Sequence, residues 1–158
     1  MSALSALDVE RLRVQLLKTA WALTGDANAE DLVHETLAAL MKSTTAVDHP
    51  LAYARVALIN RIRSHWRRLE RERSATRRVR QRATPEIALP EHSGEVWAAV
   101  QELPFRQRVA VVLVVVDDLP LRAVADHLGC STETARTHLR RGKTRLATTL
   151  RHLEQEQS

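Results

Sequence analysis

Residues 119–146, LPLRAVADHLGCSTETARTHLRRGKTRL, constrain the fold most because they predict two helices joined by a tight turn. Gly129 stands where a helix needs a left-handed stop, and Ser131 or Thr132 is expected to cap the second helix. The first helix has three start signals, two carboxylates that can cap it and a proline suited to its opening turn: Asp117, Asp118 and Pro120. Together these signals predict a helix-turn-helix.

The second predicted helix has two distinct faces. Its inner stripe is small or apolar and comprises Ala135, Leu139, Gly142 and Leu146. A glycine on this stripe predicts a close approach between two helices. The outer face carries long hydrogen-bond donors and one carboxylate: Glu133, Arg136, Thr137, Arg140 and Arg141. Such a face fits the major groove of DNA, whereas a merely solvated basic hairpin is the alternative interpretation.

Positive charge is concentrated in two blocks. The net charge is +5, and 17 of the 24 Lys and Arg residues lie within residues 55–82 and 130–151. The first block contains 11 arginines and only two acidic residues, Glu70 and Glu72. Two such blocks indicate two contacts with a polyanion.

Helical spacing predicts three helices in the N-terminal half. The first covers residues 7–24 and ends at Gly25, the second begins after Asp26 or Asn28 and runs to about Ser43, and the third follows His49-Pro50. The second helix is expected to bury a wide stripe: Leu32, Val33, Thr36, Leu37, Leu40 and Met41. The third is expected to place its early apolar positions at Leu51, Tyr53, Val56, Ile59 and Ile62.

Three features of these helices have open interpretations. Asp31, His34 and Glu35 form an acidic face opposite the stripe, which is either a solvated surface favoured by the helix dipole or a docking face for a basic partner. Asn60 indicates a break in the third helix or a specific contact there. Trp66, among arginines, is either a core anchor or a ring that stacks on an exposed base.

Residues 77–94 predict a flexible linker, because prolines, serine and glycine follow an arginine-rich stretch without an apolar stripe. A short helix that Pro104 closes is expected next. Residues 105–116 are rich in β-branched side chains, and we predict a buried helix because no partner strand is evident. The predicted fold class is therefore all-α, with two small helical domains at 1–76 and 95–158.

Several classes of function are not expected. The sequence contains no catalytic, phosphate-loop or metal-ligand pattern, so we predict neither an enzyme nor a protein with a metal, a cofactor or a small-molecule substrate. Cys130 is the only cysteine, which excludes an internal disulfide and favours the cytoplasm. No signal peptide is visible, and the longest apolar run, Val109–Val116, is too short for membrane insertion.

Three segments, in order, resemble one protein family. They are ALTGDANAEDLVHETLAALMK, PLAYARVALINRIRSHWRR and ELPFRQRVAVVLVVVDDLPLRAVADHLGCSTETARTHLRRGKTRL, and they are similar to the extracytoplasmic-function group of the sigma-70 family of bacterial RNA polymerase sigma factors. The resemblance implies a protein that binds core RNA polymerase and directs it to promoter DNA. It makes residues 1–76 sigma region 2 and residues 95–158 sigma region 4, with an anti-sigma factor as a further candidate partner.

The resemblance also implies roles for individual residues. The polymerase-docking residues would be Asp31, His34 and Glu35. The minus-ten strand would contact Asn60, Arg61, Arg63, Ser64, Trp66 and Arg67. The minus-thirty-five element would be read by Thr132, Glu133, Arg136, Thr137, Arg140 and Arg141.

This chain departs from the family pattern at two of these positions. His34 stands where glutamine is common, and Glu133 stands where a small residue is usual. By the resemblance, a carboxylate at 133 would lie near the DNA phosphates, where it would reject some sequences or read a cytosine amine. Two other classes remain as alternatives: a stand-alone helix-turn-helix regulator that binds operators as a dimer, and an interaction protein that sequesters a partner.

Overall fold

The computed structural model describes residues 4–43, 47–73 and 94–158, and these residues form seven α-helices and no strand. Contacts divide the chain into unit 1, Met1–Ile87, and unit 2, Ala88–Ser158. The predicted all-α class with two small helical domains is confirmed. The predicted linker lies outside the described residues except for Gly94, which begins a helix, so its boundaries remain a prediction.

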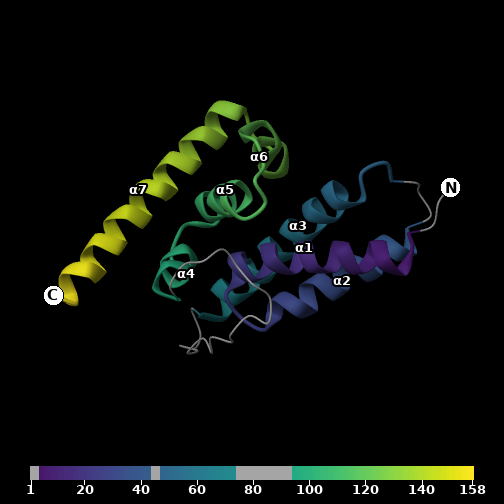
Figure 1. Cartoon of the computed structure of the whole chain (residues 1–158), viewed down its shortest axis with the longest axis horizontal. Coiled ribbons are helices and arrows are strands. Elements are labelled where there is room, and N and C mark those ends of the chain that lie inside the picture. The colour runs from purple at the N-terminus through teal and green to yellow at the C-terminus, as the bar shows by residue number, and fades with distance from the viewer. Residues whose placement is uncertain (1–3, 44–46, 74–93) are drawn as a thin grey trace. The chain divides into compact units, whose positions relative to one another are not determined.

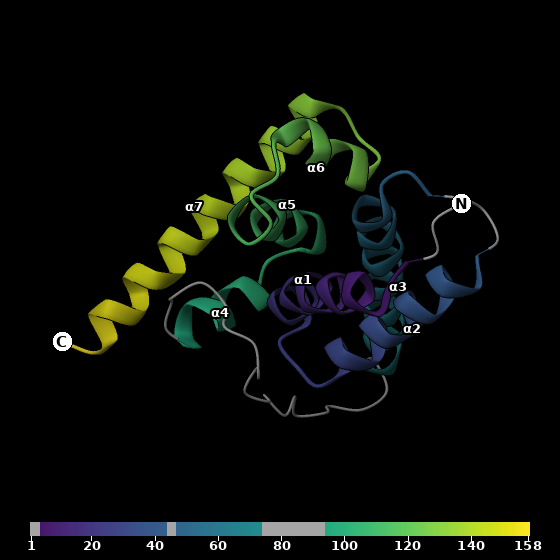
Figure 2. The ribbon, with the colours of Figure 1, turned by 45° about the vertical axis from the view of Figure 1, so that its right-hand side comes forward.

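Unit 1 is a bundle of three helices: α1 (Ala6–Thr24), α2 (Asn28–Lys42) and α3 (Pro50–Arg73). Each helix packs against the other two, and both ribbon views show them side by side (Figures 1 and 2). The largest side chains that are fully buried in unit 1 come from all three helices: Leu16, Leu23, Val33, Leu58, Ile59 and Ile62. Burial of these aliphatic groups is the main driving force for the bundle.

Local signals set both ends of α1. The Ser5 hydroxyl accepts from the Asp8 backbone N–H at 3.1 Å, and the Asp8 carboxylate accepts from the Ser5 backbone N–H at 3.1 Å. This capping box satisfies two helix-end donors, and its hydrogen bonds from Ser5 lower the pKa of Asp8. Gly25 ends the helix with φ 69°, as predicted.

The predicted apolar stripes of α2 and α3 were wrong at three positions. Met41 is 65% exposed, Tyr53 is 51% exposed and Val56 is 40% exposed. The buried face of α3 is rotated from the predicted one and consists of Ala54, Arg55, Leu58, Ile59, Ile62 and Trp66. The helix continues unbroken through Asn60, whose side chain is exposed, so the predicted break is absent.

Unit 2 consists of α4 (Gly94–Gln101), α5 (Phe105–Val115), α6 (Leu121–Leu128) and α7 (Thr132–Glu156). The long helix α7 packs against the other three helices (Figure 1). Residues 105–115 are helical, as predicted, and their centre is buried. Helix α7 extends ten residues beyond the predicted motif because Leu150 and Leu153 continue its half-buried stripe.

The helix-turn-helix is confirmed, although its first helix begins differently from the prediction. Gly129 adopts φ 65°, and the Ser131 hydroxyl caps α7 by accepting from the Thr134 backbone N–H at 3.1 Å. The predicted Asp117 or Asp118 cap of α6 was wrong: Pro120 is the N-cap, without a side-chain hydrogen bond. The chain turns at Asp118, which has φ 51°, so the carboxylates lie before the first turn of α6.

Gly142 lies where α7 packs tightly against α5. It is buried, and a Cβ atom there would lie 2.8 Å from Val111 Cγ2 and 3.2 Å from the Gln107 carbonyl oxygen. The predicted need for a small residue on the inner stripe is therefore confirmed.

Candidate nucleic-acid interface

The six residues predicted to read a duplex all lie in the N-terminal half of α7. Thr137 is half-buried, and the others are exposed: Thr132, Glu133, Arg136, Arg140 and Arg141. The inner stripe on the opposite side includes the buried Ala135 and Gly142. Because one side of α7 packs against the rest of unit 2, the opposite side presents a continuous basic surface. A single α-helix with such a surface has the width that the major groove admits.

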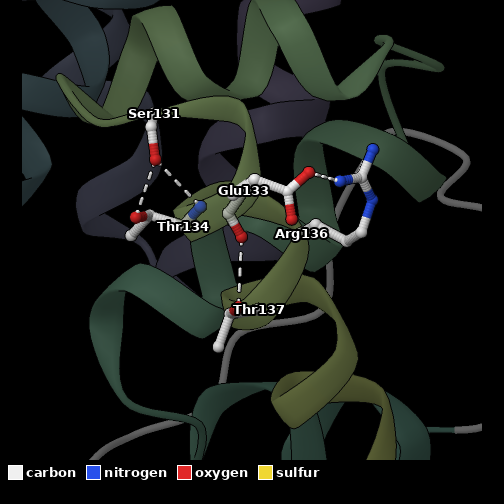
Figure 3. A network of polar contacts seen from close by, with 5 residues as sticks. All are labelled: Ser131, Glu133, Thr134, Arg136 and Thr137. Atoms are coloured by element: carbon white, nitrogen blue, oxygen red, sulfur yellow. Dashed lines mark hydrogen bonds and ion pairs between the residues drawn. The ribbon is translucent and has the colours of Figure 1, made fainter.

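Two contacts fix the first turn of this surface, and Figure 3 shows them together with the cap. Glu133 and Arg136 form an ion pair between Oε1 and Nη1. The Thr137 hydroxyl donates to the Glu133 carbonyl oxygen at 3.1 Å (Figure 3). The side chains that would meet DNA first are therefore held in relation to each other before DNA binds.

The basic surface of α7 extends past the residues that were predicted. Lys143, Arg145 and Arg151 are exposed, and the exposed Thr144 and Thr148 lie among them. The Thr144 hydroxyl donates to the Arg140 carbonyl oxygen at 2.9 Å. Continued helical spacing of basic residues after Arg141 was the available sequence signal.

His138 lies beside this surface but was not among the predicted residues. It is half-buried. Burial, followed by the nearby Arg106 and Arg141 guanidinium groups, lowers its pKa from the ordinary 6.5. The ring therefore stays neutral to lower pH than a free histidine.

The predicted minus-ten residues of α3 differ in how far their side chains are exposed. Asn60, Ser64 and Arg67 are exposed and lie on one face of the helix, and Arg63 is half-buried. Trp66 is 9% exposed, so the ring lies in the core of unit 1. This burial favours the core-anchor interpretation of Trp66 over the alternative of a ring that stacks on an exposed base.

An exposed aromatic ring does occur on the same face, at a position that the sequence interpretation assigned to the core. Tyr53 and Val56 lie seven and four residues before Asn60, so the three side chains share one side of α3. Tyr53 is 51% exposed. The signal was the phase of the helix: Ala54, Leu58 and Ile62 define a buried stripe that excludes residue 53.

Arg61 lies on a different side of α3, in a polar hollow between α2 and α3. The hollow has a volume of about 290 Å³ and is lined by Asn28, Asp31, Leu32, Glu35, Arg61, His65 and Arg68. Its carboxylates come from α2 and its cationic groups from α3. Among these described side chains, no ion pair within 4.0 Å joins a carboxylate of α2 to a cationic group of α3. His34 is exposed on α2 but does not line the hollow.

The described ranges 4–43, 47–73 and 94–158 also bear on metal binding and membrane insertion. These residues contain no group of three His, Cys, Asp or Glu side chains that could hold a metal ion. Within the same ranges no helix has the length and apolar character needed to cross a membrane.

Comparisons with known proteins identify both units. Residues 9–72 match the model of sigma-70 region 2, and residues 93–146 match the model of sigma-70 region 4. No curated protein matches the chain.

Two solved structures are similar over most of the chain. The sigma factor RpoE from Bartonella quintana, solved in complex with the anti-sigma factor NepR, is 23% identical with a TM-score of 0.73, covering 92% of this chain and 95% of that one. The Mycobacterium tuberculosis extracytoplasmic function sigma factor SigJ is 25% identical with a TM-score of 0.63. That match covers 90% of this chain but 53% of SigJ, so this chain spans about half of SigJ.

Proposed function

The chain belongs to the extracytoplasmic-function group of the sigma-70 family of RNA polymerase sigma factors, and we propose how its two units divide that role. Unit 1 docks on core RNA polymerase and holds the minus-ten strand, and unit 2 reads the minus-thirty-five duplex. The observation that carries this proposal is the occurrence of region 2 and region 4 in order, each on its own compact unit.

Docking on polymerase uses the acidic face of α2. Asp31 and Glu35 are exposed, one helical turn apart, and border the polar hollow. Because the hollow also contains Arg61 and Arg68, it suits a partner that presents basic and acidic side chains side by side. We therefore include Arg61 in the docking surface, with His34 at its edge.

The minus-ten strand is held by the exposed face of α3. Asn60 and Ser64 supply hydrogen-bonding groups, and Arg63 and Arg67 supply charge for the backbone. Unpaired bases are bound mainly by stacking and by backbone charge, so an exposed aromatic ring is needed near these groups. Tyr53 meets that need, and Trp66 supports the face from the core.

The minus-thirty-five element is read by the N-terminal half of α7. Arginine donates to guanine edges in the major groove, and hydroxyl and guanidinium groups elsewhere on the helix contact phosphates. Thr132, Glu133, Arg136 and Thr137 are nearest the helix start, where base contacts occur in helix-turn-helix proteins. Arg140 and Arg141, with Lys143 and Arg145 behind them, then follow the backbone.

We also propose that an anti-sigma factor binds this chain and that the protein works in the cytoplasm, where polymerase is. Support comes from the RpoE structure, which was solved with an anti-sigma factor. Co-purification from the native host under uninduced conditions tests this partner. Recovery of the chain without a stoichiometric inhibitor would contradict the proposal.

Run-off transcription tests the main function. The purified chain is combined with core polymerase from its own host and with fragmented host DNA. We expect discrete transcripts whose upstream regions share two spaced motifs. DNA binding that needs no polymerase and starts no transcript would instead favour a stand-alone helix-turn-helix regulator.

A further inference from the structure

Two arginines and a histidine from two helices of unit 2 lie close together. His138 of α7 is half-buried, and the exposed Arg141 follows it by three residues, so the two side chains share one side of the helix. Arg106 is exposed in the first turn of α5. Burial lowers the pKa of the His138 ring, and the charges of Arg106 and Arg141 lower it further. Both guanidinium groups therefore lie near the ring.

The contact between α5 and α7 holds this cluster together. Gly142, one turn after His138, lies so near α5 that a Cβ atom there would be 3.2 Å from the Gln107 carbonyl oxygen. Arg106 directly precedes Gln107, so the same contact fixes the start of α5 beside the His138 turn of α7. Packing between the two helices thus keeps like charges near each other despite their repulsion.

Nothing in the described part of the chain balances this positive charge. No salt bridge there joins Arg106 or Arg141 to a carboxylate, and His138 makes no hydrogen bond there. Helices α4 and α6, which also pack against α7, contribute no charge that shifts the pKa of His138. Helix α5 begins without a side-chain cap, so its first N–H groups add to the positive potential. Unbalanced cationic groups held in one place attract an anion.

We propose that Arg106, His138 and Arg141 form a site for one phosphate group, which binds more tightly as the pH falls. The guanidinium groups donate to the phosphate oxygens, and the imidazole adds a charged donor once it is protonated. A bound dianion in turn stabilises the imidazolium, so phosphate and proton bind cooperatively.

The site lies at the edge of the basic surface of α7 and includes a residue from outside the helix-turn-helix. Around α7, His138 stands between the exposed Arg141 and the buried Gly142. Two sources can supply the phosphate: the DNA backbone, in which case the inference rests on the proposed function of unit 2, or a free phosphorylated molecule.

Histidine NMR of the full chain tests the site without DNA. Imidazole signals of wild type, H138Q and R106Q are followed from pH 8 to 5 in sodium sulfate and in sodium chloride of equal ionic strength. Sulfate is the probe because it remains a tetrahedral dianion throughout this range, and H138Q identifies the His138 signal. The exposed His152, at the far end of α7, is the internal control. Circular dichroism checks that each variant keeps its helices.

We expect sulfate to raise the pKa of His138 in wild type, to raise it less in R106Q, and to leave the His152 signal unaffected. The same His138 titration in sulfate and in chloride would overturn the proposal.

Promoter binding identifies the source of the phosphate. Holoenzyme containing wild type, H138Q, H138R or H152Q is titrated at pH 7.5 and 6 with duplex from a promoter found by run-off transcription. If the DNA backbone fills the site, acidification raises wild-type affinity by roughly three- to tenfold relative to H138Q, because binding takes up a proton. H138R should then bind tightly at both pH values, and H152Q should behave like wild type.

The remaining outcomes separate the inference from the proposed function. A sulfate effect on His138, together with equal pH responses of wild type and H138Q on DNA, assigns the site to a free phosphorylated molecule. If wild-type holoenzyme binds no upstream element, the proposed function of unit 2 fails, and the sulfate titration still decides whether the phosphate site exists.

Discussion

The two units expose different chemistry. Among the described residues, the exposed large apolar side chains are Leu7, Met41, Tyr53 and Val56 in unit 1 and Val115 in unit 2. Unit 1 also brings carboxylates and arginines into one hollow. The outer face of residues 132–145 in unit 2 instead consists of arginine, lysine and threonine with a single carboxylate, Glu133.

This difference fits the proposed division of DNA binding, in which unit 1 holds an unpaired strand and unit 2 reads a duplex. Unpaired bases expose apolar faces, so a surface that holds a separated strand needs an exposed ring, whereas paired bases offer only their edges and phosphates. Unit 1 exposes the ring of Tyr53, and unit 2 exposes the hydrogen-bond donors of the α7 arginines. Unit 1 has, in addition, the mixed charges that suit a protein partner.

The largest expected effect tests whether the protein-docking surface belongs to unit 1. D31K/E35K replaces both carboxylates of the hollow with lysines. The new positive charges then lie beside Arg61 and Arg68. We expect affinity for core polymerase to fall by roughly 100-fold or more, because like charges then meet the basic side chains of the partner. Titration of labelled protein with core polymerase measures the change.

The control for this experiment makes the same change in charge elsewhere in unit 1. D48K/E70K alters two exposed carboxylates that do not line the hollow. It should bind polymerase like the wild type. Equal loss of binding in both variants would show a general effect of net charge and would contradict the docking assignment.

A second variant tests how far the proposed DNA-binding surface of unit 2 depends on the packing of α7 against α5. G142L inserts a side chain where a Cβ atom alone would lie 2.8 Å from Val111 Cγ2. Overpacking of this kind should lower the free energy of unfolding of unit 2 by about 1–3 kcal/mol. Denaturant unfolding measures it, and K143L adds the same side chain at an exposed neighbour. Equal midpoints for the two variants would contradict the close contact between α5 and α7.

The points where helices begin and end could be predicted, because each depends on one or two residues. Gly25 and Gly129 both adopt the left-handed conformation that ends a helix, and Ser131 caps α7 through its own hydroxyl. Such signals act within a few residues and need no tertiary contact. The family resemblance then supplied the order of the two units.

Exposure could not be predicted equally well, because it depends on which side of a helix meets its neighbours. In α3, valine is as apolar as the residues that are buried, tyrosine has a large apolar ring, and Arg55 is 5% exposed on the buried face. Hydrophobicity alone therefore gave the wrong rotation at Tyr53 and Val56. The same uncertainty placed Trp66 in the candidate site when its ring belongs to the core. The Glu133–Arg136 pair was also missed, although its spacing permits it.

A third set of variants tests the contrast between the exposed ring of Tyr53 and the buried ring of Trp66 in α3. Y53A removes an exposed ring, so we expect about tenfold weaker binding of holoenzyme to single-stranded minus-ten DNA with an unchanged melting temperature. Y53F should retain most of the binding. W66A removes a ring that is 9% exposed and should lower the melting temperature. Unchanged strand binding in Y53A would contradict the stacking role.

The smallest expected effect is a difference between the two units in how their stability depends on pH. Burial and the nearby Arg106 and Arg141 groups lower the pKa of His138 below 6.5, so the unfolded chain binds this proton more readily than the folded chain. Its contribution to the stability of unit 2 is therefore present above pH 6.5 and is lost as the pH falls through the lowered pKa. In unit 1 the hydrogen bonds from Ser5 lower the pKa of Asp8 below 3.8, so that contribution persists to far more acidic conditions.

Amide hydrogen exchange, read separately for peptides of α7 and α1, distinguishes these cases between pH 7.5 and 5. After correction for intrinsic exchange rates, we expect protection in α7 to decrease on acidification and protection at the start of α1 to change less. H138Q should flatten the response of α7, because glutamine has no proton to gain. An equal decrease in H138Q and wild type would show that another group controls the pH dependence of unit 2.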